Sequence, residues 1–217
     1  LAQTIKLSDA KYCWLFSSDD LLYVNAICRI LELLKTEPTV ILINRTICDT
    51  KMQELATQNW LDTKSDGVFH LTSESDLDKY LNAAKSIGAL FSYMSSIVLA
   101  KEHWDESLKD RRYHASCYSH AFDIFTMLLK PNAKLYHFVS PLVLCRSFND
   151  SFSMRGFKER IMLDFVSYQF LQQEFFTLPK RRRSFLKILK REHSWYRLLR
   201  LKTERHSPAC WQESKDL

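Results

Sequence analysis

The sequence predicts an α/β fold, in which helices cover a sheet. Short apolar segments rich in β-branched or aromatic residues, such as 11–16 and 39–45, alternate with segments of helical periodicity, such as 21–35 and 113–130. This alternation is typical of a layered α/β domain. The 217 residues are 46% hydrophobic and 13% aromatic, so the chain has enough apolar side chains for a packed core.

Each element has its own local signal. Residues 39–45 are dense in β-branched side chains, which is typical of a strand. Asp19 or Asp20 can cap the helix expected at 21–35. Ser73 with acidic residues after it starts a further helix, Pro131 ends another, and Pro141 marks an edge or a bulge. The expected strands are 11–16, 39–45, 89–100 and 133–146, and the expected helices are 21–35, 50–60, 74–86, 113–130, 156–177 and 182–202.

The composition excludes several classes of site. The chain has only three glycines, which excludes a glycine-rich phosphate loop of the Rossmann or P-loop kind. Its six cysteines form no Cys-x-x-Cys pair, so the sequence disfavours a structural zinc site and favours a reducing, cytoplasmic compartment. No segment reaches the roughly 18 uninterrupted apolar residues that a membrane span requires.

Two adjacent carboxylates follow the first expected strand. Asp19 and Asp20 end the strand at 11–16 and stand before a helix. Mg²⁺ and Mn²⁺ prefer oxygen ligands, and a nucleotide diphosphate supplies more of them. Such a metal offsets the charge that develops on a leaving diphosphate. The alternative is that both residues only cap the helix, which aspartate does well.

The segment around these carboxylates, KYCWLFSSDDLLYVNAICRILELL, resembles the central segment of family 2 glycosyltransferases of the GT-A fold. The resemblance continues in SYMSSIVLAKEHW (92–104), CYSHAFDIFTMLL (117–129) and CRSFNDSFS (145–153), and it covers about residues 8–155. Within the family it points to the abequosyltransferase-like enzymes of bacterial surface polysaccharide synthesis.

The resemblance implies a domain organisation and a metal site. Residues 1–155 would be the acceptor-side, C-terminal portion of a GT-A-like nucleotide-diphospho-sugar transferase domain, and 156–217 a helical basic extension. The family carries its nucleotide-binding part ahead of this segment, so the chain alone is expected to bind nucleotide-sugar poorly. Asp19 and Asp20 would bind Mn²⁺ or Mg²⁺, and Ser18 and Asp19 would contact the donor. Ser18 departs from the family pattern, which often has aspartate there.

The resemblance also places the catalytic base in the stretch 113–127, where His114, His120 and Asp123 are available. His120 and Asp123 are three residues apart, so both can share one helix face. A carboxylate beside a histidine orients it and raises its basicity. The family resemblance favours His120. The alternative is that His120 is a hydrogen-bonded residue at the edge of the core.

Two further residues are candidates for substrate contacts. Arg146 follows an apolar strand, and arginine binds phosphate through two parallel hydrogen bonds, although a surface ion pair is its simpler role. Trp104 could stack on a sugar face, although a tryptophan in this setting is more often a core residue.

The formal net charge of +6 is concentrated in 180–205. Lysine and arginine there alternate with leucine, phenylalanine and Trp195, which suits a helix lying on an anionic membrane. The alternative is a helix packed on the domain with its charges in water. No nucleic-acid-binding motif accompanies the charge, so no nucleic-acid partner is expected.

Together these observations predict a metal-dependent glycosyltransferase that moves a hexosyl or deoxyhexosyl group. Its donor would be a nucleotide-diphosphate sugar and its acceptor a lipid-linked or oligosaccharide saccharide, at the cytosolic face of the membrane. The alternative is a truncated, non-catalytic α/β module whose basic tail binds a membrane or a partner.

Overall fold

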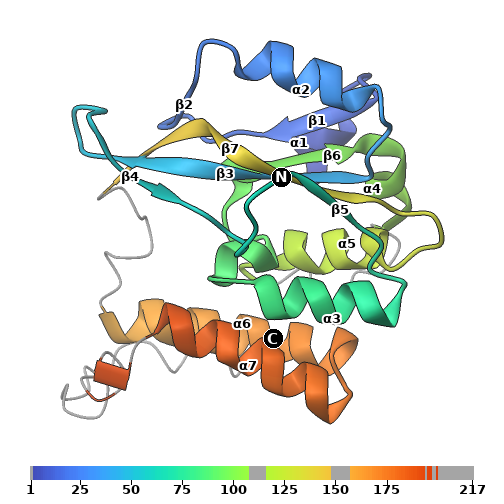
Figure 1. Cartoon of the computed structure of the whole chain (residues 1–217), viewed down its shortest axis with the longest axis vertical. Helices are drawn as coiled ribbons and strands as arrows, with labels where there is room; N and C mark the ends of the chain where they lie inside the picture. The colour runs from blue at the N-terminus through green and yellow to red at the C-terminus, as the bar shows by residue number, and fades with distance from the viewer. Residues whose placement is uncertain (1, 108–115, 148–156, 194, 197–198, 200–217) are drawn as a thin grey trace.

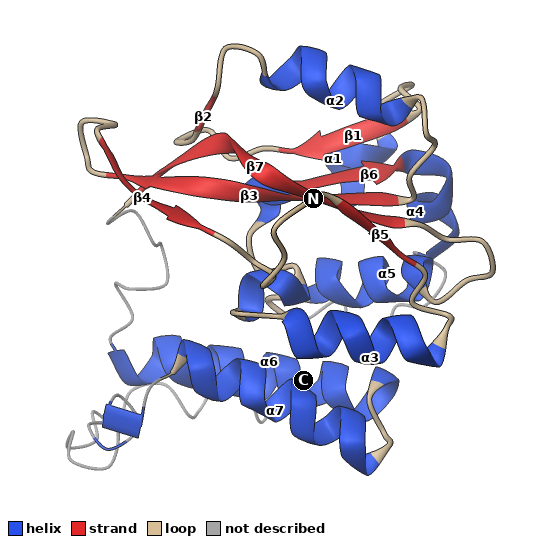
Figure 2. Cartoon of the chain, viewed as in Figure 1, coloured by secondary structure: helices blue, strands red, loops and turns tan. Residues whose placement is uncertain are grey.

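The computed structural model describes residues 2–107, 116–147, 157–193, 195–196 and 199. It confirms a mixed α/β architecture, in which the described strands form one sheet of order β1-β6-β3-β7-β2, with β4 paired to β3 and β5 paired to β7 (Figure 2). The strands are β1 (Tyr12–Leu15), β2 (Leu21–Leu22), β3 (Val40–Cys48), β4 (Glu54–Gln58), β5 (Gly67–Phe69), β6 (Ile97–Ala100) and β7 (Leu135–Arg146).

The two long strands β3 and β7 run parallel at the centre of the sheet. Their register shifts between Ile43 and Arg45, where β7 carries extra residues that include Pro141. Proline has no N–H to donate to a ladder, so it is tolerated at a bulge. The expectation that Pro141 marks an edge or a bulge is therefore confirmed.

Helices form layers on both sides of the sheet (Figure 1). One face is covered by α2, and the other is covered by α3 and α5, beneath which α6 and α7 form a further layer. The helices are α1 (Ala2–Lys6), α2 (Ala26–Leu34), α3 (Glu74–Ala83), α4 (Lys101–Ser107), α5 (Ser119–Leu128), α6 (Phe157–Phe175) and α7 (Pro179–Glu192), with the short 3-10 turns η1 (Ile87–Leu90) and η2 (Met94–Ser96).

The α6–α7 layer belongs to the main hydrophobic core. Tyr168 and Leu171 of α6 and Phe185 of α7 are fully buried in the same cluster as Leu42 of β3 and Phe125 of α5. Lys180 and Arg181 of α7 also form ion pairs with acidic residues of α3. The helices expected at 156–177 and 182–202 are thus found over 157–175 and 179–192.

The helix expected at 50–60 is wrong, because β4 occupies this segment and pairs antiparallel with β3. A turn precedes β4, in which the Asp49 carboxylate accepts hydrogen bonds from the backbone N–H groups of Lys51 and Gln53, at 2.8 and 2.9 Å. Met52 in this turn has a positive φ of 65°. Pairing with the long neighbour β3 outweighs the helix preference of Glu54 and its neighbours.

The strand expected over 89–100 is also shorter than predicted, since only β6 is extended and η1 and η2 precede it. Gly88 allows this compact path, because a Cβ atom built there would lie 2.0 Å from the Trp60 ring. The segment between the two turns, with Phe91 at a positive φ of 63°, contributes to the candidate site described next.

Candidate functional site

The candidate site lies in the turn that follows β1. The two aspartates of this turn differ in environment, since Asp20 is only 6% exposed and Asp19 is half-buried. Ser18 is exposed, and the Asp19 carboxylate accepts a hydrogen bond from the Ser17 hydroxyl. Neither aspartate caps α2, because the N-cap residue of that helix is Asn25. The alternative role of the pair as helix caps is therefore wrong.

Two hydroxyl groups hold the Asp20 carboxylate. The Tyr93 hydroxyl donates to Oδ2, and the Ser95 hydroxyl donates to the same oxygen at 2.5 Å. Ser95 Oγ also accepts a hydrogen bond from the Ser17 backbone N–H at 3.0 Å. Burial, and then the hydrogen bond to Asp20, raise the pKa of Tyr93 far above its usual value, so Tyr93 keeps its proton and acts as a donor.

Strand pairing explains why residues so distant in sequence meet here. In the antiparallel pair of β1 and β6, Leu15 lies opposite Ile97, so the end of β1 meets the beginning of β6 and the η2 turn before it. The Trp14 indole adds a hydrogen bond of 2.8 Å to the Ser95 carbonyl. The pairing of β2 with β7, in which Leu21 lies opposite Leu144, fixes the position of the other end of the turn that carries the aspartates.

Continuing the β2–β7 register by one residue places Asp20 opposite Cys145. The Cys145 thiol interacts with both Asp20 and Tyr93. Burial raises the pKa of this thiol, and the nearby charge of Arg45 only partly opposes the increase. The raised pKa keeps the thiol neutral at physiological pH. Arg146, the next residue, is exposed at the end of β7 and so lies at the same corner of the sheet as the aspartates.

Arg45 supplies a cation beside this corner. Its guanidinium carbon lies 4.0 Å from the Tyr93 ring centroid and 5.1 Å from that of Trp60. The guanidinium also donates to Gln58 Oε1 at 2.8 Å and to Cys145 Sγ at 3.1 Å. No acidic residue in the described part of the chain forms an ion pair with Arg45. A fixed cation of this kind suits an anionic ligand.

His120 of α5 is buried and connects to the same region. Its Nε2 atom lies 2.8 Å from the Phe91 carbonyl oxygen, which accepts, so Nε2 carries the proton and Nδ1 carries the lone pair. Burial lowers the pKa of His120, and the hydrogen bond to Phe91 only partly opposes this. The histidine therefore holds the backbone two residues before Tyr93. Asp123, one helical turn further, is also buried, and His114 lies outside the described residues.

The structure disfavours a sugar contact for Trp104. Its side chain is only 1% exposed and belongs to the main core, so no ring face is open to a ligand. Sequence reasoning assigned no role to Tyr93, Ser95, Arg45 or Cys145. Arg45 carried the clearest signal, because a charged residue at the end of the apolar run 39–45 requires a specific partner or ligand.

The carboxylates can be compared with the needs of a divalent metal. The described residues contain no group of three or more His, Cys, Asp or Glu side chains placed to hold an ion. A metal at Asp20 would therefore take most of its oxygen ligands from the substrate or from water, as Mg²⁺ does when it binds nucleotide phosphates. One carboxylate held through Oδ2 by two hydroxyl donors fits this mode.

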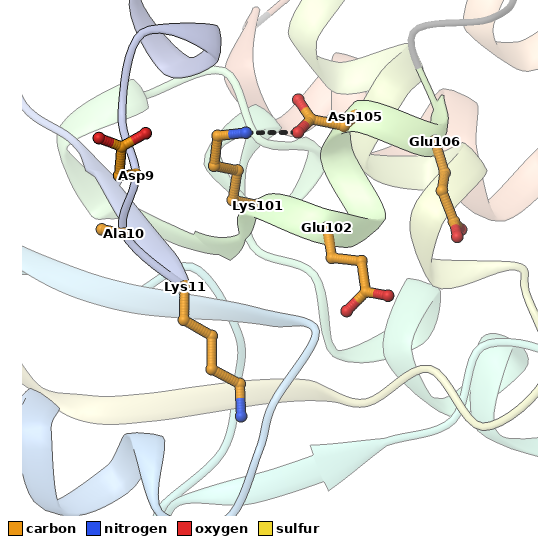
Figure 3. Close-up of a pocket in the computed structure, with 7 residues that line it drawn as sticks. All are labelled: Asp9, Ala10, Lys11, Lys101, Glu102, Asp105 and Glu106. Atoms are coloured by element: carbon orange, nitrogen blue, oxygen red, sulfur yellow. Dashed lines mark hydrogen bonds and ion pairs between the residues drawn. The ribbon is translucent and has the colours of Figure 1, made fainter.

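An open pocket of about 640 Å³ lies at the opposite end of β1 (Figure 3). Its lining carries both signs of charge, and Lys101 and Asp105 neutralise each other at 2.5 Å. None of the candidate site residues lines it. The lining residues are Asp9, Ala10, Lys11, Lys101, Glu102, Asp105 and Glu106.

Comparison with known proteins gives an independent view of the chain. No family model matches it. It is similar to the abequosyltransferase RfbV of Salmonella typhimurium, with 32% identity over 195 residues. The match covers 88% of this chain and 58% of that protein, so the chain spans less than two thirds of the relative's length. The chain is thus similar to an abequosyltransferase along most of its own sequence.

Proposed function

We propose that this chain is the acceptor-side part of a glycosyltransferase that moves a sugar from a nucleotide-diphosphate donor to a saccharide acceptor. The observation that carries the proposal is the buried Asp20 carboxylate, held by neutral hydroxyl groups beside Arg45, a cation that forms no ion pair with a described acidic residue, in a chain similar to an abequosyltransferase. A cation and a carboxylate side by side are what a metal–diphosphate complex requires. Synthesis of a bacterial surface polysaccharide such as O-antigen is the setting that the relative suggests.

The reaction assigns a task to each residue. The acceptor hydroxyl oxygen forms a bond to the anomeric carbon of the sugar, while the bond from that carbon to the diphosphate oxygen breaks. The leaving diphosphate takes the electron pair of the broken bond and the negative charge. Mn²⁺ or Mg²⁺, when bound, supplies charge neutralisation for that group. Asp20, with Asp19 next to it, would hold the ion, and Arg45 and Arg146 would contact the phosphate oxygens.

The proton of the acceptor hydroxyl goes to a base, for which we propose His120 with Asp123 as its neighbour. Its Nε2–H is engaged by the Phe91 carbonyl, so Nδ1 is the atom that would accept the proton. The lowered pKa keeps His120 neutral at physiological pH, as a base must be before it accepts a proton. The non-catalytic alternative receives no support from the relative, which is an enzyme by name.

The direct test is binding of Mn²⁺ and inorganic pyrophosphate by calorimetry, followed by sugar transfer in the full-length natural protein. We expect Asp20→Asn to abolish the Mn²⁺-dependent part of pyrophosphate binding, and Arg45→Gln to weaken pyrophosphate binding with or without metal. Asp9→Asn, which removes an exposed carboxylate at the opposite end of β1, is the matched control. Unchanged Mn²⁺-dependent binding by Asp20→Asn would refute the metal assignment.

A further inference from the structure

The described residues contain no helix that is both long and apolar enough to cross a membrane. The outer face of the α6–α7 layer nevertheless has the character of a membrane-contacting surface. This layer lies farthest from the sheet, and α3 and α5 cover only its inner side (Figure 1).

The first observation is an apolar stripe on α6. Met162, Val166 and Phe170 are 39, 45 and 47% exposed. Their spacing of four residues places them along one line of the helix, about 12 Å long. The opposite face of α6 is also apolar and is buried in the core through Tyr168 and Leu171. A surface helix needs only one apolar face, so the second one calls for a partner.

The second observation is a cationic row on α7 next to that stripe. Arg183, Lys187 and Lys190 are exposed, lie on the helix face opposite the buried Phe185, and form no ion pair with any described residue. Leu186, which is 37% exposed, adds an apolar side chain to α7 between Arg183 and Lys187.

The structure also shows which part of the basic segment is unavailable to a membrane. Phe185, Ile188 and Leu189, which in the sequence form an apolar face for the tail, are buried in the core. Lys180 and Arg181 are bound to acidic residues of α3. A bilayer contact through this apolar face of α7 is therefore ruled out, and a contact made by α7 must use its outer side.

We propose that the outer face of the α6–α7 layer, formed by Met162, Val166, Phe170 and Leu186 together with Arg183, Lys187 and Lys190, docks the protein on an anionic lipid surface. Apolar side chains that enter the headgroup region, next to cations that meet anionic lipids, are the two elements of interfacial binding. This row of cations, which form no ion pair with a described residue, favours an anionic bilayer over an uncharged apolar partner. This proposal does not depend on the proposed function.

The test is co-sedimentation of the chain with phosphatidylcholine vesicles and with vesicles that also contain phosphatidylglycerol. We expect binding only to the anionic vesicles. The triple variant Arg183→Gln, Lys187→Gln, Lys190→Gln should lower the partition coefficient about a hundredfold, from the contribution of each basic residue near such a surface. The matched control, Lys6→Gln, Lys51→Gln, Lys64→Gln, removes the same charge elsewhere and should lower it only a few-fold.

A second pair of variants tests the apolar stripe. Met162→Gln, Val166→Gln, Phe170→Gln should reduce binding about tenfold, since each side chain is already partly exposed and loses only part of its burial. The control Val24→Gln, Ile27→Gln, Leu31→Gln changes three apolar residues in and just before α2, which are more exposed than the α6 stripe, and should leave binding unchanged. Circular dichroism and urea midpoints check that every variant is folded.

The proposal is overturned by an equal loss in both charge variants, because net charge alone would then explain the binding. It is equally overturned by wild-type affinity in the α6 variant, or by pelleting with neutral vesicles to the same extent as with anionic ones. If the chain pellets with neither, the lipid assignment is wrong.

Discussion

Two buried carboxylates of this protein accept a hydrogen bond from a tyrosine hydroxyl, yet their surroundings differ. Asp164 of α6 accepts from Tyr118 at 2.6 Å, from Arg160 at 2.6 Å and from His193 at 2.9 Å, so both of its oxygens have partners. Asp20 accepts from the neutral hydroxyls of Tyr93 and Ser95, both on one oxygen.

The difference separates a structural role from a binding role. Burial raises the pKa of Asp164, but hydrogen bonds from His193 and Tyr118 and the charge of Arg160 together lower it below its usual value. Asp164 therefore joins α5, α6 and α7. No described Lys, Arg or His forms an ion pair with Asp20, so its position favours an added cation.

The largest expected effect is on the activity of Asp20→Asn. We expect Mn²⁺-supported transfer to fall about a thousandfold, as loss of one key electrostatic group does. Its free energy of unfolding should change by less than about 1 kcal/mol, because the partners of Asp20 are neutral hydroxyls. Turnover is measured at saturating Mn²⁺ and stability by urea unfolding. Retained turnover, or unfolding of the variant, would place Asp20 in the same class as Asp164.

The converse is expected for Asp164→Asn. Removing one member of a buried charged network costs about 3–5 kcal/mol, because Arg160 and His193 then lose their partner. Urea unfolding measures the loss, and pyrophosphate binding at a temperature where the variant is folded should stay at the wild-type value. A loss of stability under 1 kcal/mol would mean that α6 and α7 are held by apolar contacts alone.

Acid should destabilise the protein in two steps, the first through His137 and the second through Asp164. His137, buried in the sheet between Thr63 and Asn44, has a pKa lowered by burial from 6.5 to about 4. As the pH falls, His137 is protonated in the unfolded chain before it is protonated in the folded one. Its contribution to the free energy of unfolding is therefore full above pH 6.5 and falls by about 3 kcal/mol on the way to pH 4.

The contribution of Asp164 is lost in the same direction, on acidification, but at lower pH. It is present above its unfolded value of 3.8 and is lost only as the pH falls through the lower folded pKa. Urea unfolding from pH 7.5 down to about 2 measures both steps. His137→Asn should flatten the dependence between pH 6.5 and 4, and an unchanged slope in that variant would exclude His137 as the cause.

The smallest effects are expected from the two tyrosines. Tyr93→Phe should weaken Mn²⁺-dependent pyrophosphate binding roughly tenfold, the value of one hydrogen bond to a charged group, with little loss of stability. Tyr118→Phe should instead cost about 1–2 kcal/mol of stability with binding unchanged. Calorimetry and urea unfolding of both variants form a two-by-two comparison. An identical pattern for the two would remove the distinction between the carboxylates.

Sequence reasoning located the aspartates of the candidate site but not the residues that surround them. The pair Asp19–Asp20 stood out because a strand and a helix flank it. Tyr93, Ser95 and Cys145 lie in segments that carry the family resemblance, but their role could not be predicted, because it depends on which strands lie next to β1 and β2. The sugar contact predicted for Trp104 is not supported by the structure, because a tryptophan that stacks on a sugar and a tryptophan in a core can have the same local sequence.

The basic C-terminal segment shows the same limit. Its composition predicted an amphipathic helix, and α7 is one, but the sequence did not say which partner covers its apolar side. In the structure that partner is the domain itself, through Phe185 and Ile188. The apolar face that remains exposed belongs to α6, which carries apolar residues on both sides.

By itself the sequence determined the α/β class, the strands at 11–16 and 39–45, the bulge at Pro141 and the acidic turn after β1, because these depend on local periodicity and on residues with restricted backbones. Only the tertiary structure decided that residues 54–58 form a strand and that Asp20 is held by hydroxyls while Asp164 is held by cations. Strand order and the packing of helix layers bring together residues as distant as Asp20 and Ser95. Contacts between such distant residues leave no periodic trace in the chain.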